Sequence, residues 1–153
     1  MNLDTPILSL LRPDQIPAAA ELLGAQLREH GITPSLERTR AVLTQMAGDE
    51  RLGFVLVALA PDGKLLGVAY GGAFLSVEHG GLSGWLDELY VRPEYRGAGI
   101  GTKLLAEFIR VASARGWRAI DLEVESDHRR VVPLYERHGF EPQTRSRFYR
   151  KLS

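Results

Sequence analysis

The chain has 153 residues, of which 44% are hydrophobic, and this is enough to bury the core of one globular domain. Lysine plus arginine equals aspartate plus glutamate at 19 each, so no bulk charge recruits nucleic acid or an anionic membrane. Cysteine is absent, which excludes disulfides, a thiolate metal site and a cysteine nucleophile.

The N-terminal stretch predicts one strand and two helices. Met1–Pro6 has no basic region followed by an apolar run, and no apolar segment reaches membrane-spanning length, so we expect a soluble, cytoplasmic protein. Ile7–Leu11 predicts a first strand. Asp14 is the expected N-cap of a helix whose apolar residues recur at helical spacing until Gly31, and a second helix is expected over Pro34–Gly48.

A hairpin is expected next. Gly53–Leu59 is continuously apolar, as a strand covered on both faces should be, and Leu65–Phe74 predicts the returning strand. Pro61–Lys64 between them has the proline, aspartate and glycine of a tight turn. The Gly71-Gly72 pair indicates a bulge or a close backbone approach inside the second strand.

The C-terminal half predicts alternating strands and helices. Trp85–Val91 is a strand, and Thr102–Arg115 is an amphipathic helix with Gly116 as its C-cap. Ala119–Glu125 alternates perfectly between apolar and acidic residues and predicts a half-buried strand. A helix capped by Ser126 or Asp127 runs to His138, starting late or kinking at Pro133. The chain is expected to end in two short strands, Phe140–Pro142 and Ser146–Leu152.

The segment between the predicted strand and helix has the composition of an anion site. Glycines allow a close approach of backbone N–H groups, and a helix N-terminus supplies unpaired donors and a positive dipole end. Lys103 follows Thr102, so the spacing of a P-loop fails, and the same threonine replaces the last glycine of a dinucleotide fingerprint. Arg96, Gly99 and Gly101 instead fit the pattern Arg-x-x-Gly-x-Gly. An ordinary glycine-rich turn is the alternative.

The surrounding motifs are more specific than the turn itself. Leu86–Pro93 precedes the turn, and Leu134–Phe140, with the pattern Leu-Tyr-Glu-x-x-Gly-Phe, follows the predicted helix and strand. Together these motifs resemble the GNAT N-acetyltransferase superfamily over residues 84–142. The resemblance implies an α/β (α+β) fold with a mixed, mostly antiparallel sheet, a splayed strand pair and helices on both faces. It also implies one domain, residues 1–153, with acetyl-CoA bound by residues 84–153 and the acceptor by residues 1–83.

The resemblance further implies which residues hold acetyl-CoA. The pantetheine arm would add to the backbone of the strand before the turn, and the pyrophosphate would lie on the turn. His128 occupies a position where many members carry asparagine, so it either contacts the cofactor or lies on the surface. The implied cofactor residues are Leu89, Tyr90, Val91, Arg96, Gly97, Ala98, Gly99, Ile100, Gly101, Thr102 and His128.

Three residues are candidates for the chemistry. Asp87 and Glu88 lie nearest the thioester in the resembled fold, and either could take a proton from an ammonium substrate, with Asp87 slightly favoured. Consecutive strand residues point to opposite faces, although a bulge could bring both into reach. Tyr135 is the candidate general acid because its phenol is protonated at neutral pH. The alternatives are two solvated carboxylates and a tyrosine packed beside Phe140.

The expected reaction is acetyl transfer from acetyl-CoA to a primary amine of a small molecule. Acetylation of a protein N-terminus or lysine is one alternative, and a non-catalytic acyl-CoA-binding module is another. The resemblance makes Glu29, His30 and Glu37 possible substrate contacts, although solvated helix ends are the simpler interpretation. No metal, nucleic acid or membrane is expected to bind, and a homodimer is left open.

Overall fold

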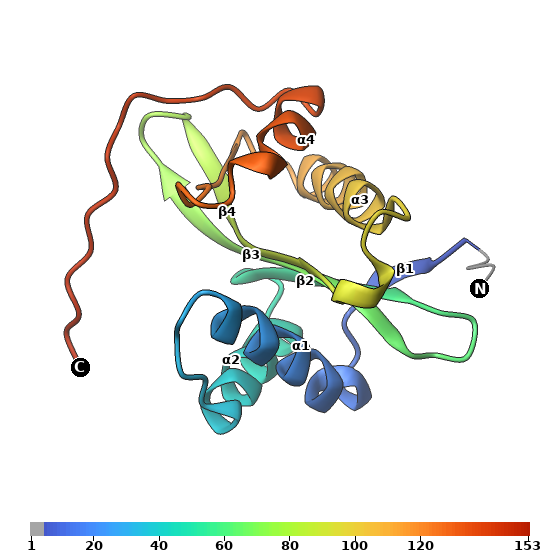
Figure 1. The fold of residues 1–153 in the computed structure, drawn as a ribbon. Coiled ribbons are helices and arrows are strands. Elements are labelled where there is room, and N and C mark those ends of the chain that lie inside the picture. The colour runs from blue at the N-terminus through green and yellow to red at the C-terminus, as the bar shows by residue number, and fades with distance from the viewer. Residues whose placement is uncertain (1–4) are drawn as a thin grey trace. The chain divides into compact units, whose positions relative to one another are not determined.

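A computed structural model describes residues 5–153. The prediction that Met1–Pro6 is not a signal peptide falls partly outside these residues. The chain forms two compact units, the first ending at Glu123 and the second comprising Val124–Ser153. The first unit is built on a five-stranded sheet with the strand order β1-β2-β3-β4-β5 (Figure 1). The strands are β1 (Ile7–Leu10), β2 (Gly53–Leu59), β3 (Leu65–Ser76), β4 (Gly81–Val91) and β5 (Ile120–Asp121).

The sheet is mixed and mostly antiparallel, as predicted. β1 to β4 pair in antiparallel order, and β5 runs parallel to β4. The expected β2–β3 hairpin is confirmed, and Gly63 in its turn has a φ of 90°, a left-handed conformation that glycine adopts without strain. β2 is buried along its whole length, which explains why its sequence is continuously apolar.

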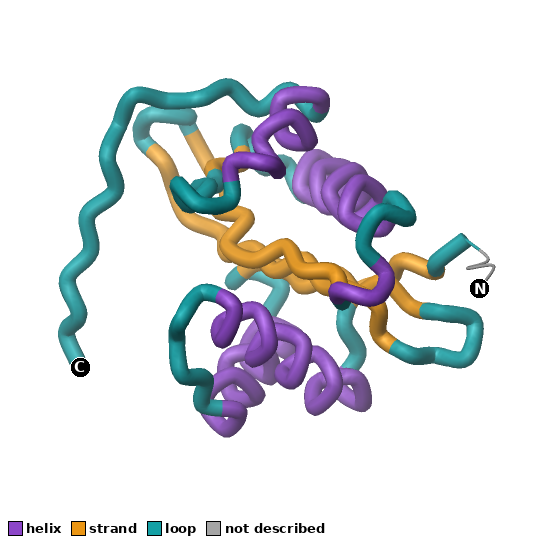
Figure 2. Tube along the Cα trace, in the orientation of Figure 1, coloured by secondary structure: helices purple, strands orange, loops and turns teal. Residues whose placement is uncertain are grey.

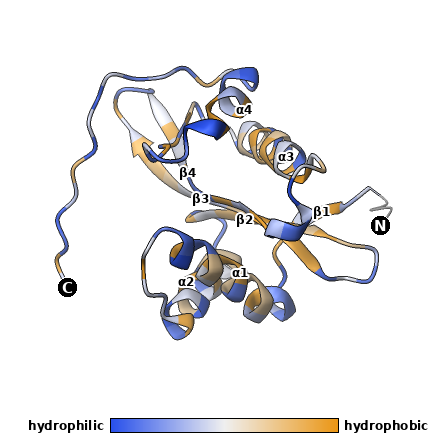
Figure 3. Cartoon of the chain, in the orientation of Figure 1, coloured by the Kyte–Doolittle hydropathy of each residue, from blue (hydrophilic) through white to orange (hydrophobic). Residues whose placement is uncertain are grey.

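Helices cover both faces of this sheet. α1 (Ile16–Glu29) and α2 (Leu36–Gly48) lie on one face, and α3 (Ile100–Ala114) lies on the other (Figures 1 and 2). α3 buries the stripe that its sequence predicts, including Leu104, Leu105 and Phe108. The hydrophobic residues of α3 and of the central strands form this side of the core (Figure 3).

An aromatic cluster beneath α3 confirms the close approach predicted at the glycine pair. The ring centroid of Phe108 lies 4.5 Å from that of Phe54 and 6.1 Å from that of Trp117. A Cβ atom added at Gly71 would lie only 2.2 Å from Cζ of Phe108. Glycine is therefore required where β3 passes under this ring.

The helix boundaries agree with most of the predicted signals. Gly31 and Gly116 follow α1 and α3 with φ values of 75° and 78°. The expected N-cap at Asp14 is wrong, because Pro13–Gln15 form a short 3-10 turn and α1 begins after Gln15. The Gln15 side chain accepts a hydrogen bond from the Arg12 backbone at 2.9 Å, which fixes this entry. α3 begins at Ile100, two residues earlier than predicted from Thr102.

The last part of the chain departs most from the prediction. β5 covers Ile120–Asp121 and not the predicted Ala119–Glu125. The second unit contains a 3-10 turn at Arg129–Val131 and α4 (Val132–Arg137), so the helix starts late with Pro133 in its first turn. Residues 140–153 form no strand, which makes both predicted terminal strands wrong. A strand needs hydrogen bonds from a partner strand, and the sequence of one segment cannot specify that partner.

Among the described residues, none of the helices has both the length and the apolar character required to cross a bilayer.

Candidate active site

The turn after β4 has the backbone expected of an anion site. Gly97 and Gly99 have φ values of 85° and 84°, and Gly99 is the left-handed N-cap of α3. The next amides, on Ile100, Gly101 and Thr102, begin the helix and therefore have no intrahelical acceptor. A Cβ at Gly97 or at Gly99 would meet no atom within 4 Å, so the space above the turn is open. These donors, the helix dipole and the open space fit a phosphate group.

Arg96 is held by the protein in a way that the sequence did not predict. Its Nε donates a hydrogen bond to the Val91 carbonyl at 2.9 Å, and its Nη2 lies 3.1 Å from Oε1 of Glu29. The guanidinium also lies 5.2 Å from the centre of the Tyr90 ring, in cation–π geometry. These contacts join the turn to the end of α1. Glu29 is separated from Arg96 by 67 positions, so no local pattern could reveal the pair.

The same glutamate accepts a second hydrogen bond. The Tyr90 hydroxyl donates to Oε1 of Glu29 at 3.0 Å, and burial together with this bond raises the pKa of Tyr90. Glu29 was expected as a possible substrate contact, but in the structure it links α1 to β4 and to the glycine turn. A direct contact with pyrophosphate thus stays a prediction for Arg96.

A bulge in β4 brings both candidate carboxylates to one site. Tyr70 of β3 pairs with Glu88, whereas the next residue, Gly71, pairs with Leu86. Asp87 is the additional residue at this point of β4, and the alternation of faces is interrupted there. As a result, Asp87 and Glu88 line the same cavity. Asp87 is exposed and Glu88 is half-buried.

This cavity has a volume of about 220 Å³ and lies between α1, α2 and the β3–β4 pair. Its wall is mostly aliphatic, and the charged groups are the two carboxylates and one arginine. Sequence reasoning did not identify this arginine or the tyrosine that also lines the cavity. The lining residues are Leu23, Leu27, Arg38, Thr39, Val42, Leu43, Tyr70, Asp87 and Glu88. His30 and Glu37, both expected as possible substrate contacts, do not line it.

The pKa of Tyr70 reflects the negative charge in the cavity. Its pKa is raised by burial first and then by the negative charges of Asp87 and Glu88, because all three disfavour the phenolate. The Tyr70 phenol therefore remains protonated at neutral pH and can donate a hydrogen bond into the cavity. The signal in the sequence was weak, namely a tyrosine directly before the Gly71-Gly72 pair.

The strands that flank the predicted pantetheine site separate early. β4 and β5 are paired only at Gly84 with Ile120 and at Trp85 with Asp121. The remainder of β4 pairs on its other side with β3, with Leu89 opposite Ala69. The splayed strand pair expected for this fold is present. The backbone roles of Leu89, Tyr90 and Val91 in binding pantetheine stay predictions.

The second unit holds Tyr135. Its ring packs edge-to-face against Phe140 with centroids 5.8 Å apart, and burial raises the pKa of its phenol. Packing and proton donation are compatible, because the raised pKa keeps the hydroxyl protonated.

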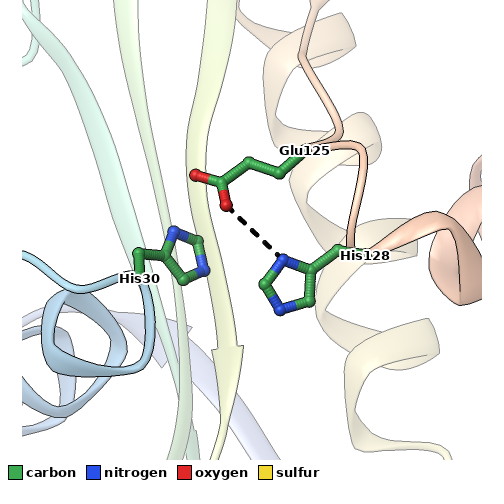
Figure 4. A group of neighbouring side chains, drawn as sticks. All are labelled: His30, Glu125 and His128. Atoms are coloured by element: carbon green, nitrogen blue, oxygen red, sulfur yellow. Dashed lines mark ion pairs between the residues drawn. The ribbon is translucent and has the colours of Figure 1, made fainter.

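His128 lies in the same unit as Tyr135. Its Nδ1 is 3.3 Å from Oδ1 of Asp127. The same nitrogen is 3.7 Å from Oε2 of Glu125 (Figure 4). His30, also drawn there, belongs to the first unit. Both carboxylates lie beside the same ring nitrogen. A contact between His128 and the cofactor stays a prediction.

Comparison with known proteins gives a consistent result. The model of the acetyltransferase (GNAT) family matches residues 17–140. An L-methionine sulfoximine/L-methionine sulfone acetyltransferase of Pseudomonas aeruginosa is 35% identical over 104 residues, covering 64% of this chain and 59% of that protein. N-alpha-acetyltransferase 30 of Schizosaccharomyces pombe is 42% identical over 59 residues, covering 39% of each chain. Across the first few curated relatives, the matched segment spans 25% to 59% of their own lengths.

Solved structures match over nearly the whole chain. A Clostridium acetobutylicum protein described as a predicted acetyltransferase, solved with acetyl-CoA, has a TM-score of 0.78 at 18% identity. The alignment covers 95% of this chain and 96% of that one. At this level of identity the match supports the fold.

Proposed function

The chain belongs to the acetyltransferase (GNAT) family, and we propose that it transfers an acetyl group from acetyl-CoA to a primary amine of a small molecule. One observation carries the proposal. The β4 bulge directs Asp87 and Glu88 into a cavity, and the end of the same strand leads into the left-handed glycine turn of α3. A single strand thus connects a site for an amine with a site for a phosphate.

Acetyl-CoA supplies an activated thioester, and the residues of this chain hold it and move protons. The amides of Gly97 to Thr102 bind the pyrophosphate, and this converts attack by the amine into an oriented reaction. A backbone N–H near Leu89 polarises the thioester carbonyl. Asp87 or Glu88 accepts a proton from the ammonium group, directly or through water.

The remaining step concerns the leaving group. As the nitrogen–carbon bond forms and the carbon–sulfur bond breaks, Tyr135 donates its phenolic proton to the departing thiolate, and the proton that the acetylated nitrogen releases restores the phenol through water. This phenol is protonated at neutral pH and so has a proton to give, although burial raises its pKa and makes it a weaker acid. The expected cytoplasmic location and the question of a homodimer stay predictions from the sequence.

The small cavity favours a small acceptor over a protein. The Pseudomonas aeruginosa relative is named for small-molecule substrates, which agrees with this preference. The Schizosaccharomyces pombe relative is named an N-alpha-acetyltransferase, so a protein N-terminus or a lysine stays the alternative acceptor. A non-catalytic acyl-CoA-binding module would need neither the carboxylate pair nor Tyr135.

Thiol release from acetyl-CoA, measured with a panel of small amines and peptides, tests the proposal. Turnover with small amines is expected, faster turnover with peptides would favour the protein-directed alternative, and binding without turnover would refute enzyme function. A matched pair of variants tests the cofactor site. Gly99→Ala adds a methyl group over the turn, whereas Gly63→Ala imposes the same left-handed strain in the distant β2–β3 turn. Only Gly99→Ala is expected to weaken acetyl-CoA binding in calorimetry.

A further inference from the structure

We infer that the acceptor is an amino acid or a closely related amine that carries a carboxylate and an apolar body. The inference rests on the proposed function and narrows its substrate class. It comes from one residue of the cavity, Arg38, which the catalytic argument does not use.

Arg38 places a permanent positive charge in the wall of the cavity that also holds Asp87 and Glu88. It belongs to the first turn of α2, whereas the carboxylates belong to β4, so the two kinds of charge come from different elements. Within residues 5–153, Arg38 forms no ion pair. Its guanidinium is therefore available to a ligand, and its planar set of donors suits a carboxylate.

The two charges together discriminate between classes of amine. A carboxylate pair alone would favour any cationic acceptor, including a polyamine. An arginine in the same small cavity opposes a second positive charge and stabilises a negative one. An acceptor that has both an ammonium and a carboxylate can satisfy both sides.

The rest of the wall indicates an apolar body. Leu23 and Leu27 of α1 face the cavity together with Val42 and Leu43 of α2. Val42 is 46% exposed, so part of this apolar wall is in contact with water. Covering it with an aliphatic side chain of the substrate would add favourable burial. The Tyr70 phenol supplies one further donor for a carboxylate or carbonyl oxygen.

Matched substrates test the inference with the full chain. L-leucine, L-leucinamide and isopentylamine share one aliphatic body, but only the first has a carboxylate. ε-Aminocaproate and hexylamine make the same comparison with the carboxylate far from the amine. We expect kcat/KM to be about 10- to 100-fold higher for the acid in at least one set, the range for one charge-assisted contact. The amine of leucinamide is less basic than that of leucine, so a larger fraction of it is neutral and reactive at a given pH. This difference favours leucinamide and therefore works against the expected preference for leucine.

Two arginines of the same helix provide the variant and its control. Arg38→Gln is expected to raise KM for the acid and to leave KM for the uncharged analogue unchanged. Arg40→Gln removes an exposed charge on α2 that does not line the cavity, and it should preserve the preference. Folding of both variants is checked by their thermal midpoints.

The outcomes separate the inference from the proposed function. Turnover of amines with no preference for the acid in either set, or a preference that survives Arg38→Gln, would overturn the inference and leave acetyl transfer intact. Absence of thiol release with every amine, despite binding of acetyl-CoA, would instead refute the proposed function.

Discussion

The substitution Gly71→Ala is expected to destabilise the protein much more than the same change one residue later. The new Cβ would lie 2.2 Å from Cζ and 2.6 Å from Cε2 of Phe108, against an ordinary contact distance of about 3.5–4.0 Å. Phe108 is fully buried and packs on Phe54, so its ring cannot turn aside. Overpacking of this kind typically costs about 1–3 kcal/mol.

Gly72→Ala is the matched control. The nearest atom to its new Cβ is the Leu52 carbonyl oxygen at 3.8 Å, which is an ordinary contact. Where alanine fits, it stabilises by about 0.4–1 kcal/mol because the unfolded chain loses freedom. The two variants should therefore differ by roughly 1.5–4 kcal/mol, or about 3–15 °C in Tm for a chain of this size.

Urea denaturation, monitored by circular dichroism, measures this difference. If the two variants have the same m-value, the difference between their midpoint urea concentrations gives the difference in their free energies of unfolding. If the free energies of unfolding of Gly71→Ala and Gly72→Ala agree within about 0.5 kcal/mol, β3 does not pass under Phe108 as described. Because Gly71 adjoins the bulge that carries Asp87 and Glu88, Gly71→Ala should also lower kcat/KM for any acceptor. Gly72→Ala should leave it close to the wild-type value.

Three further predictions concern the candidate catalytic residues and the ion pair at the glycine turn. Tyr135→Phe keeps the ring against Phe140 and should lower kcat by about 10²–10⁴-fold if thiolate departure limits the rate. Since burial raises the pKa of Tyr135, any alkaline decline due to its ionisation should lie above a pH of about 10, and an unchanged kcat in the variant would exclude its role. Asp87→Asn should lose most activity at low pH, where the amine arrives protonated, and recover as the pH rises; equal loss at every pH would argue against a base. A double-mutant cycle of Glu29→Gln and Arg96→Gln should give a coupling of only about 0.2–1 kcal/mol, because these side chains are 37% and 39% exposed. Strict additivity in urea denaturation would show that the pair contributes nothing.

The features that the sequence predicted correctly are those with local causes. The glycine-rich turn before α3 has left-handed backbone at Gly97 and Gly99, and the close approach expected at the Gly71-Gly72 pair is found at Gly71. Each of these depends on the missing side chain of the glycine itself.

The features that the sequence did not reveal depend on contacts between distant segments. Arg38 reaches the cavity only because α2 packs against α1 and β2, and Glu29 meets Arg96 across 67 positions. The predicted strand at Ser146–Leu152 is absent because a strand needs hydrogen bonds from a partner strand, and the segment's own sequence cannot specify that partner.

Both tryptophans of the chain lie where β4 and β5 separate. Trp85 is the last residue of β4 paired with β5, and a Cβ on the preceding Gly84 would overlap the ring of Trp117, 1.8 Å from its Cζ3 atom. With only two tryptophans in the sequence, all indole fluorescence originates at this fork. The protein therefore carries a built-in optical reporter, and any ligand that widens or closes the fork should change the emission without an added label.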